Sequence, residues 1–449
     1  MAPSALDIEE EQRHFSNVIS TFQNYASYSL AASNRRRKDL FTLPQADQEL
    51  LSSLGYKEKL EEVDKAIITN AEFLKQVVAD PEIFGHDVDD GDDEETGEGE
   101  QVEGRNLSSQ SQEHQHTHNH DGPDQSHSRS HSHHNHHSGG HDQNHGHSHD
   151  HGGRRQKRYK PTEFDMDKLR STLKQLVRDW SEEGAEERKT SYEPMKEALL
   201  AHFSDIPREE RRNFRVLVPG AGLGRLAYDV ANLGFACQGN EFSHYMLLTS
   251  FLILNRSEEV KIHTIYPYVH SFSNVPTRAS MLRAISIPDV LPNLPAGSNF
   301  SLVAGDFEEI YGGKADPDEP QSGLWDAVMT CFFIDTAKNI VNYLRIIHRI
   351  LAPGGVWINL GPLLWHWENN NTNDPSVELD LAEVKELARK IGFELKVDRF
   401  TLLPSKFSSD KDFDIYQNEK TIDATYTTNS EGMLGYTYRT AFWTATKIL

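Results

Sequence analysis

Residues 216–243 read VLVPGAGLGRLAYDVANLGFACQGNEFS, and this stretch decides the fold. It opens with an apolar run, turns on Gly220, Gly222 and Gly224, and reaches a carboxylate at Glu241. Glycines let a chain turn sharply and admit a ligand close to the backbone. A carboxylate about 20 residues further on, at the end of the next strand, can accept both hydroxyls of a ribose. The order of these features predicts a nucleotide-binding α/β unit.

The glycine pattern alone leaves the nucleotide open. Gly222, Gly224 and Ala227 satisfy the G-x-G-x-x-A pattern of dinucleotide-binding folds, so NAD also fits this stretch. A later segment, AGDFEEIY, favours a different ligand because it places Asp306 and Phe307 together at the end of a strand. A carboxylate there can bond an adenine amino group, and a neighbouring ring can pack against the base.

Two further segments complete a series. WDAVMTCFFIDTA, residues 325–337, is a strand followed by a polar turn, and LAPGGVWINLG, residues 351–361, is a helix end, a Pro-Gly-Gly turn and a strand. The series resembles the class I S-adenosylmethionine-dependent methyltransferases. In that family the glycine turn follows strand one, the ribose carboxylate ends strand two, the adenine contacts follow strand three, and the Pro-Gly-Gly turn precedes strand five. The bland alternative, a Rossmann-like sheet without a cofactor, is disfavoured because the glycines, Glu241 and Asp306 occur together in register.

The chain from residue 161 to residue 449 alternates between strand-like and helical runs. The strand candidates lie in FRVLVPG, FACQGNE, FSLVAGD, WDAVMTCF, GGVWINLG, FELKVDRFTLL and YTYRTAFWTAT. The middle candidates are apolar nearly throughout, which is typical of strands covered on both faces. We therefore expect an α/β domain with a Rossmann-like, mostly parallel sheet and helices on both faces. An amphipathic helix over residues 165–184 precedes the sheet.

Two other zones precede this domain. Residues 1–84 are expected to be helical, because residues 9–30 and 60–80 each carry an apolar stripe at helical spacing. Such helices need a partner surface, which would be the C-terminal domain or a second subunit in a homodimer. Residues 85–160 are expected to be disordered, because almost nothing in them could be buried.

The low-complexity zone has two distinctive parts. Ten of the seventeen residues from Asp87 to Glu103 are acidic, and fifteen of the 23 histidines lie between His114 and His151. Neutral imidazoles bind zinc, nickel and copper, so the histidine tract could bind divalent metal weakly. It has no cysteines and no fixed ligand spacing, so it does not specify a structural zinc site, and we prefer an insert without catalytic consequence. The closing cluster RRQKRYK is better explained as a solvated charge run than as a nuclear-import signal.

Composition limits the protein class further. The net charge is −23, but much of the excess lies in the acidic tract, so charge argues only weakly against nucleic acid, which we nevertheless do not expect as a partner. Two cysteines, Cys237 and Cys331, cannot build a disulfide framework and fit a reducing compartment. The N-terminal residues lack an apolar signal core, and no apolar run approaches the roughly 20 residues of a membrane span. We expect a cytosolic or nuclear protein.

Several segments taken together resemble one particular family within this class of methyltransferases. The opening stretch, CFFIDTA, INLGPLLWHW and KQLVRDWSEEGAEER resemble the carnosine N-methyltransferase family over about residues 161–449 and, more loosely, over the N-terminal helices. The proline before the first glycine is uncommon among methyltransferases, whereas the insert at 85–160 is not part of the family pattern. The resemblance implies methyl transfer to an imidazole nitrogen of carnosine, giving anserine. Two alternative hypotheses remain. One is an enzyme of the same fold acting on a protein histidine or another small amine, and the other is a His-rich metal-binding protein with a vestigial cofactor fold.

The resemblance also implies site residues. The predicted cofactor-binding residues are Gln175, Arg178, Gly220, Gly222, Glu241, Asp306, Phe307 and Cys331. The predicted substrate-binding and catalytic residues are Asp335, His366 and Tyr438, with Tyr426 and Tyr436 as weaker substrate-binding candidates.

Independent chemistry supports part of this set. In open α/β sheets, ligands bind outside the carboxyl ends of the strands, and Asp335 and His366 each follow one strand candidate. An imidazole with a pKa near ~6.5 is mostly neutral at pH 7, so no strong base is needed. A carboxylate that accepts the N–H of one ring nitrogen fixes the tautomer and makes the other nitrogen more basic. We assign that role to Asp335 as a hypothesis.

Each candidate also has a structural explanation. Asp335 could cap the helix of residues 336–351, since Asp is favoured there, and both roles can hold together. His366, between two tryptophans, could be a hydrogen-bonded core histidine, and the tyrosines could simply pack the sheet. Arg178 could lie on a solvated helix face. His348 we interpret as structural.

Overall fold

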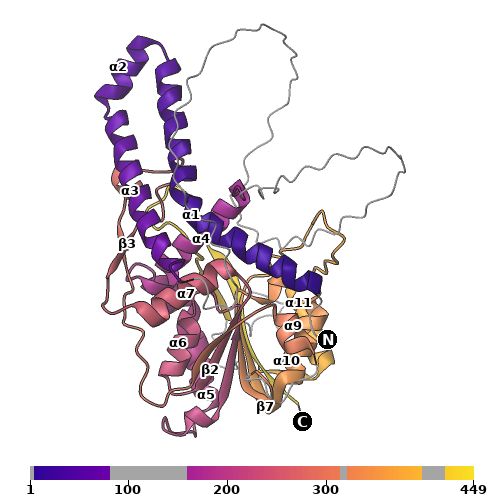
Figure 1. The fold of residues 1–449 in the computed structure, drawn as a ribbon. Helices are drawn as coiled ribbons and strands as arrows, with labels where there is room; N and C mark the ends of the chain where they lie inside the picture. Colours follow the sequence, from indigo (N-terminus) through magenta and orange to yellow (C-terminus); the bar gives the residue numbers. More distant parts are fainter. Residues whose placement is uncertain (1–4, 81–158, 314–320, 397–419, 449) are drawn as a thin grey trace, which may run out of the picture.

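The computed structural model of the protein describes residues 5–80, 159–313, 321–396 and 420–448 (Figure 1). The predicted disordered zone, 85–160, lies outside these ranges except for its last two residues. Within the described ranges, no helix combines the length and the apolar character that crossing a bilayer would require.

One large sheet carries the C-terminal domain. Its strands run in the order β5-β2-β1-β6-β7-β10-β8, and β9 also pairs with β10. The five strands from β5 to β7 are parallel, and β10 is antiparallel to its neighbours. The strands are β1 (Arg215–Pro219), β2 (Ala236–Glu241), β5 (Phe300–Ala304), β6 (Trp325–Cys331), β7 (Leu351–Gly361), β8 (Phe393–Lys396), β9 (Lys420–Ala424) and β10 (Tyr438–Lys447).

Each of the seven strand candidates overlaps one of these strands, so the mostly parallel α/β sheet is confirmed. The candidate FELKVDRFTLL continues past β8 into residues outside the described ranges. Three strands were not predicted. One is β9, and the other two are β3 (His263–Ile265) and β4 (Ile285–Ile287), which form a separate two-stranded antiparallel sheet. Strands of three residues are too short to leave an alternation pattern.

Both faces of the sheet are covered because its central strands are apolar on both sides. Leu217 belongs to a core with helices α9, α10 and α11, whereas its neighbours Val216 and Val218 belong to a core with α5 and α6. Successive strand residues point to opposite faces, so an apolar run produces two cores. The helices are α5 (Ala185–His202), α6 (Arg225–Asn232), α9 (Phe307–Gly312), α10 (Ile340–Ile350) and α11 (Leu381–Ile391), with short helices η2 (Arg211–Asn213), α8 (Arg278–Met281) and η3 (Ile334–Thr336) between elements.

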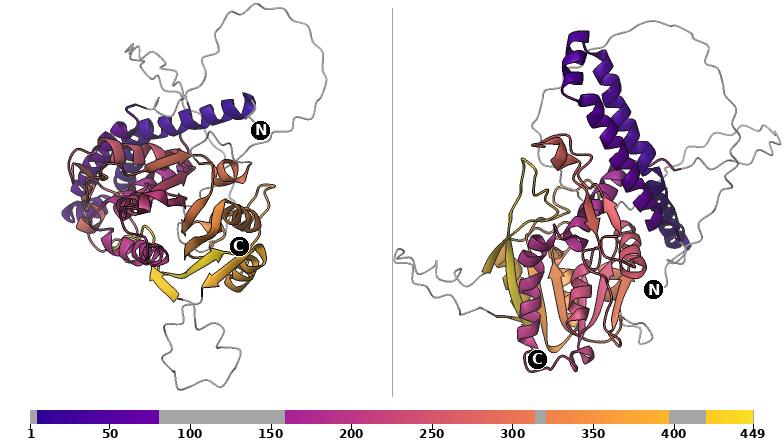
Figure 2. Two further views of the ribbon diagram at one scale, coloured as in Figure 1. Left: turned by 90° about the horizontal axis from the view of Figure 1, so that it is seen from below. Right: turned by 90° about the vertical axis from the view of Figure 1, so that its left-hand side faces the viewer.

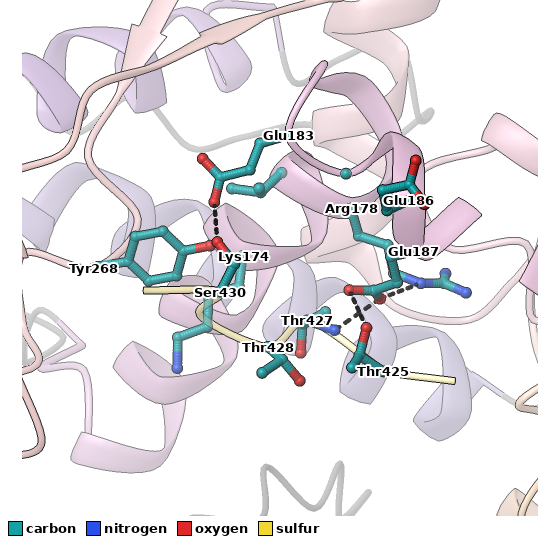
Figure 3. Close-up of a pocket in the computed structure, with 12 residues that line it drawn as sticks. Lys174, Arg178, Glu183, Glu186, Glu187, Tyr268, Thr425, Thr427, Thr428 and Ser430 are labelled. Carbon is teal, nitrogen blue, oxygen red and sulfur yellow. Dashed lines mark hydrogen bonds and ion pairs between the residues drawn. The ribbon is translucent and has the colours of Figure 1, made fainter. Parts of the chain in front are cut away.

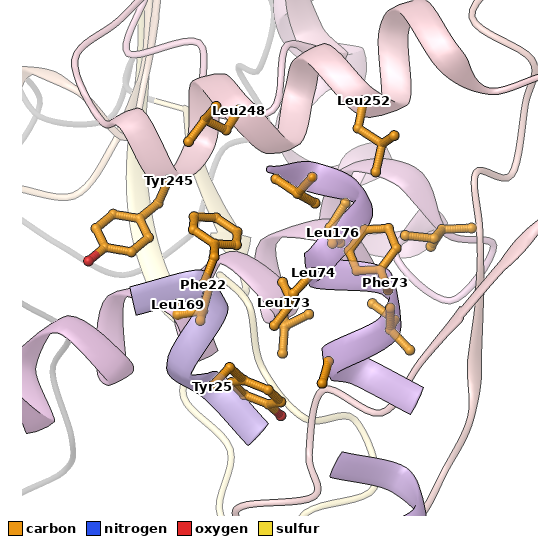
Figure 4. Packing of buried hydrophobic residues seen from close by; sticks show 14 of the residues in the cluster. Phe22, Tyr25, Phe73, Leu74, Leu169, Leu173, Leu176, Tyr245, Leu248 and Leu252 are labelled. Atoms are coloured by element: carbon orange, nitrogen blue, oxygen red, sulfur yellow. The ribbon is translucent and has the colours of Figure 1, made fainter. Parts of the chain in front are cut away.

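The N-terminal helices form a hairpin that packs on the sheet domain and extends beyond it (Figures 1 and 2). Phe22 and Tyr25 from the first helix and Leu74 from the third join a core with α4 and α7 (Figure 4). The predicted partner surface is therefore, at least in part, the C-terminal domain of the same chain. These elements are α1 (Ala5–Thr42), α2 (Gln45–Ser53), α3 (Tyr56–Val77), α4 (Glu163–Trp180) and α7 (His244–Arg256).

A buried amide joins α3 to the sheet domain. The Asn70 side chain is fully buried; its Nδ2 donates to the Tyr266 carbonyl and to the Tyr25 hydroxyl, both at 3.0 Å, and its Oδ1 accepts from the Tyr266 N–H at 2.7 Å. The Tyr25 hydroxyl also bonds His270 Nε2 at 2.8 Å. Burial lowers the pKa of His270 to about 3, so this imidazole is neutral at pH 7. The network satisfies buried polar groups that would otherwise be costly.

We predict that Asn70→Ala destabilises the fold by about 3 kcal/mol, because it leaves both backbone groups of Tyr266 and one acceptor site of Tyr25 without their partner. Urea unfolding followed by circular dichroism measures this change. Glu72→Ala, at an exposed position of the same helix, is the control and should change the free energy of unfolding by less than about 0.5 kcal/mol. Equal effects of the two substitutions would contradict the proposed join.

Candidate active site

The glycine turn between β1 and α6 adopts backbone angles that suit glycine. Gly220, Gly222 and Gly224 have φ of +65°, +57° and +80°. A Cβ on Gly220 would lie 2.6 Å from Cδ2 of the Phe333 ring, so this position also excludes a side chain by close approach. The turn therefore brings bare backbone to the carboxyl end of β1, as the sequence predicts.

Glu241 is fixed beside this turn. One carboxylate oxygen accepts the Gly222 N–H at 2.8 Å, and the other accepts the N–H groups of Phe242 and Ser243, also at 2.8 Å. Burial raises the pKa of Glu241, and the three N–H donors oppose that shift. The carboxylate at the end of β2 is thus held against the glycine turn, where a nucleoside ligand would need it.

Helix α4 presents polar side chains to the same turn. Gln175 Nε2 lies 3.6 Å from the position of a Cβ on Gly222 and donates to the Asp179 carboxylate at 3.2 Å. Arg178 is only 4% exposed, so the reading of Arg178 as part of a solvated helix face is wrong. The helix starts with a capping box in which Thr162 and Asp165 exchange hydrogen bonds, which fixes where it begins.

Arg178 is the centre of a buried cluster. Its guanidinium donates to the Tyr192 hydroxyl at 2.6 Å and pairs with Glu187 at 2.8 Å. The rings of Tyr192 and Tyr426 each have their centroid 4.7 Å from its Cζ. Cys331 Sγ, at the end of β6, lies 3.9 Å from one of its nitrogens. Burial raises the pKa of Cys331 to about 11, which keeps the thiol neutral and unreactive at pH 7.

Asp306 and Phe307 lie at the end of β5 and the start of α9. One Asp306 oxygen caps α9 by accepting the N–H groups of Glu308 and Glu309 at 2.7 and 3.2 Å. The Phe307 ring is 3% exposed and packs edge-on against Phe333, the ring that also touches Gly220. Phe307 is therefore connected to the glycine turn through packing, whereas Asp306 caps α9.

Asp335 is a buried carboxylate with one oxygen unpaired. It lies in η3 after β6 and is 2% exposed. Its Oδ2 accepts the Leu364 N–H at 3.0 Å, while its Oδ1 has no hydrogen-bond partner among the described residues. The prediction that Asp335 caps the next helix is wrong, because Asn339 caps α10 by accepting the Val341 N–H. Burial raises the pKa of Asp335 to about 7.

His366 is attached to Asp335 through the backbone. Its N–H donates to the Asp335 carbonyl at 3.0 Å, and its side chain is half-buried. The flanking Trp365 and Trp367 are buried, and their indole N–H groups donate to the Leu379 and Thr336 carbonyls. These anchors fix the backbone on both sides of His366. The loop after β7 is thus rigidly placed beside the loop after β6.

An aromatic group lies at the same edge of the sheet. Phe332 has φ of +52°, which is rare for a bulky residue, and its ring lies 4.8 Å from that of Tyr426 and 5.8 Å from that of Tyr438. Burial and the Asp335 charge raise the pKa of Tyr438, in keeping with a position near that carboxylate. The strand candidate YTYRTAFWTAT begins two residues too early, because β10 begins at Tyr438 and Tyr436 is 44% exposed in the preceding segment.

Sequence reasoning missed several members of this site. Asp179 and Tyr192 bind each other and Arg178, and Glu187 also binds Arg178. A polar residue on an amphipathic helix gives no sequence signal for burial. Phe332 lies in the segment CFFIDTA, but its unusual backbone angle has no sequence signature. The described residues contain no group of three or more side chains placed to hold a metal ion, and the histidine tract lies outside them.

The strand order, the glycine turn and the carboxylate at the end of β2 define the class of the protein. A sheet of five parallel strands followed by an antiparallel β10 inserted next to β7, with its ligand edge at the carboxyl ends, is the fold of class I S-adenosylmethionine-dependent methyltransferases.

The comparisons narrow this class to one family. The family model described as carnosine N-methyltransferase matches residues 155–448. A carnosine N-methyltransferase of Mus musculus is 45% identical over 63% of this chain and 64% of its own length. One of Schizosaccharomyces pombe is 44% identical over 62% of this chain and 70% of its own, and one of Dictyostelium discoideum is 32% identical over 96% and 76%. The chain belongs to the carnosine N-methyltransferase family. Its match spans about 64% of the length of the mouse and rat relatives.

The raised pKa of Asp335 predicts a pH-dependent stability. An unfolded Asp loses its proton near pH ~3.9, whereas Asp335 keeps it in the native state up to about pH 7. The native state therefore binds more protons between these values, and this carboxyl lowers the free energy of unfolding as pH rises through that window. Asp335→Asn should stabilise the chain relative to wild type, and this gain should be about 3 kcal/mol larger at pH 8 than at pH 5.

Urea unfolding at the two pH values measures the gain. Asp47→Asn, at an exposed position of α2, is the matched control for loss of a carboxylate. A gain from Asp335→Asn that is the same at both pH values would show that Asp335 ionises normally.

Proposed function

We propose that this protein transfers a methyl group from S-adenosylmethionine to an imidazole nitrogen of carnosine or a related histidine-containing dipeptide, with anserine as the product from carnosine. Family membership supports the reaction class. The observation that supports an imidazole as the methyl acceptor is Asp335 Oδ1, a buried carboxylate oxygen without a partner among the described residues. It lies at the sheet edge where the rings of Phe332 and Tyr438 meet. An imidazole N–H supplies the donor that this oxygen lacks.

The residues around the glycine turn fit S-adenosylmethionine. Gly220 and Gly222 leave backbone space, and Glu241 is placed to take ribose hydroxyls in exchange for its present N–H donors. Asp306 would meet the adenine, and Gln175 and Arg178, with Cys331, would line the other side. When bound, this cofactor supplies a methyl group already activated by a positively charged sulfur.

Asp335 would organise the acceptor. Its Oδ1 accepts the N–H of one ring nitrogen, which selects the tautomer and leaves the lone pair of the other nitrogen facing the donor. Methylation makes the ring cationic, and the proton on the first nitrogen can then pass to Asp335 Oδ1. This transfer is nearly balanced because the pKa of Asp335 is raised to about 7, close to that of an imidazole.

Aromatic side chains would fix the plane of the ring. Phe332 stands between Tyr426 and Tyr438 and offers a flat apolar wall beside Asp335. His366, attached to Asp335 through the backbone, would bind the remainder of the dipeptide. Placing the two reactants in line in this way can supply about 7–11 kcal/mol of the barrier reduction.

We predict that Asp335→Asn lowers methylation of carnosine by at least about 100-fold while the Kd for S-adenosylmethionine stays within twofold. The amide keeps the size of the side chain but removes the charge and the proton acceptor. Glu241→Ala should instead weaken cofactor binding by about tenfold or more, because it removes the ribose contact. Transfer of labelled methyl measures the first effect and calorimetric titration with the cofactor measures the second.

The acceptor specificity is tested in the same assay with carnosine, free histidine and bulk protein. Label in the dipeptide supports the proposal. Label confined to protein would assign the activity to a protein histidine, and no transfer with no cofactor binding would contradict the enzyme assignment. Full activity of Asp335→Asn with carnosine would contradict the role given to this carboxylate.

We also propose that two copies associate through the outer end of the helical hairpin. Helix α2 lies at the projecting end of the hairpin (Figure 2) and buries none of its residues. Phe41, Leu50 and Leu54 at this end are 64%, 62% and 70% exposed. Apolar side chains gathered at one projecting end favour a self-complementary contact. Light scattering should give twice the 51.0 kDa chain mass. The double substitution Leu50→Glu and Leu54→Glu should give a monomer, and an unchanged mass would contradict the proposal.

A further inference from the structure

The segment between β9 and β10 carries two of the predicted substrate tyrosines and is attached to α5. A cavity lies between this segment and the start of α5, with hydroxyl side chains of the segment on one wall and glutamates of α5 on the other (Figure 3). Tyr426 leaves the segment here, with its ring against Phe332 and over the Arg178 guanidinium. How this segment is held therefore decides where one wall of the acceptor site lies.

Glu187 holds the segment and the cofactor edge at once. One of its oxygens pairs with Arg178 Nε at 2.8 Å and accepts the Thr427 N–H at 2.9 Å, while its other oxygen is 3.5 Å from the Thr425 hydroxyl (Figure 3). Its side chain is 11% exposed. The carboxylate therefore bridges a predicted cofactor residue on α4 and the backbone next to Tyr426.

The segment is strained at the residue that Glu187 holds. Thr427 has φ of +51°, a conformation that costs a β-branched residue free energy and persists only where neighbouring contacts impose it. The Thr427 N–H bond to Glu187 is such a contact. Further along, Ser430 bonds Glu183, and Arg283 binds both Glu183 and Asn429. The far end of the segment is thus fixed independently of Glu187.

We propose that Glu187 is a positioning residue that couples cofactor binding to the acceptor site by fixing Tyr426. The proposal rests on the proposed function, since it assigns Arg178 to the cofactor side and Tyr426 to the acceptor side. A ligand that contacts Arg178 then steadies Glu187, and Glu187 steadies Thr427 and with it the Tyr426 ring. Arg178 keeps Tyr192 and Asp179 as partners when Glu187 is changed, so cofactor affinity and acceptor affinity respond differently.

Two substitutions break the link at its two ends. Glu187→Gln removes the charge that pairs with Arg178 and weakens both contacts. Thr427→Pro removes the N–H and cannot adopt φ of +51°, but leaves the pair of Glu187 and Arg178 in place. We expect each to raise KM for carnosine about tenfold, with the Kd for S-adenosylmethionine within twofold. The double variant should raise KM no further than either single change, because both break one link. Glu186→Gln, the exposed neighbour in the same cavity, is the matched control and should leave KM unchanged.

Hydrogen exchange gives a readout that does not need turnover. In wild type, adding S-adenosylmethionine should slow amide exchange over residues 425–430, and in Glu187→Gln it should not. If wild type fails to methylate carnosine but shows this protection, the proposed function fails and the coupling stands. Unchanged KM in both variants, additive effects, or equal cofactor protection in Glu187→Gln and wild type would each overturn the role of Glu187. If Glu187→Gln does not fold, Thr427→Pro decides by the same measurements.

Discussion

The candidate active site contains a carboxyl group, Asp335, that is buried away from water, and this burial costs free energy. One oxygen of Asp335 accepts the Leu364 N–H, and the other has no hydrogen-bond partner among the described residues. A buried acceptor without a donor destabilises the fold. The same burial disfavours the ionised carboxylate and so raises the pKa of Asp335. An apolar or amide side chain would avoid this cost. The fold nevertheless keeps a carboxylate here, and the neighbouring loops contain two anchored tryptophans and Phe332, whose φ is positive.

Arg178 is also a buried ionisable residue, but its surroundings differ from those of Asp335. Tyr192, Glu187 and Asp179 surround it, and aromatic rings flank its guanidinium. A buried charge that has several partners is costly to break, so the cluster ties α4, α5 and the segment after β9 into one arrangement. One oxygen of Asp335 has no hydrogen-bond partner among the described residues, whereas the Arg178 guanidinium contacts several partners. One edge of the sheet therefore combines an incompletely paired carboxylate with a guanidinium held by several contacts.

The sequence predicts some of these features well, for physical reasons. Apolar runs of strand length and glycines at a turn are local patterns, so the sheet and its nucleotide edge follow from short stretches. The state of Arg178 depends on what packs against α4, and part of that surrounding, the segment near Tyr426, is distant in the chain. Likewise, whether Asp335 caps the next helix depends on where α10 begins, and the N-cap of α10 is Asn339. The angles of Phe332 and Thr427 arise from tertiary contacts and have no local signature.

The N-terminal helices help to set the rotation of α4 about its own axis. Leu169, Leu173 and Leu176 recur at helical spacing and pack against α1 and α3 (Figure 4). At 100° per residue, Gln175 and Arg178 fall on the opposite face, which is where the glycine turn and Cys331 lie. Removing α1 and α3 would expose the leucine face and remove part of the packing that fixes the rotation of α4. The helical hairpin therefore acts on the cofactor edge through α4, without itself supplying any of the predicted site residues.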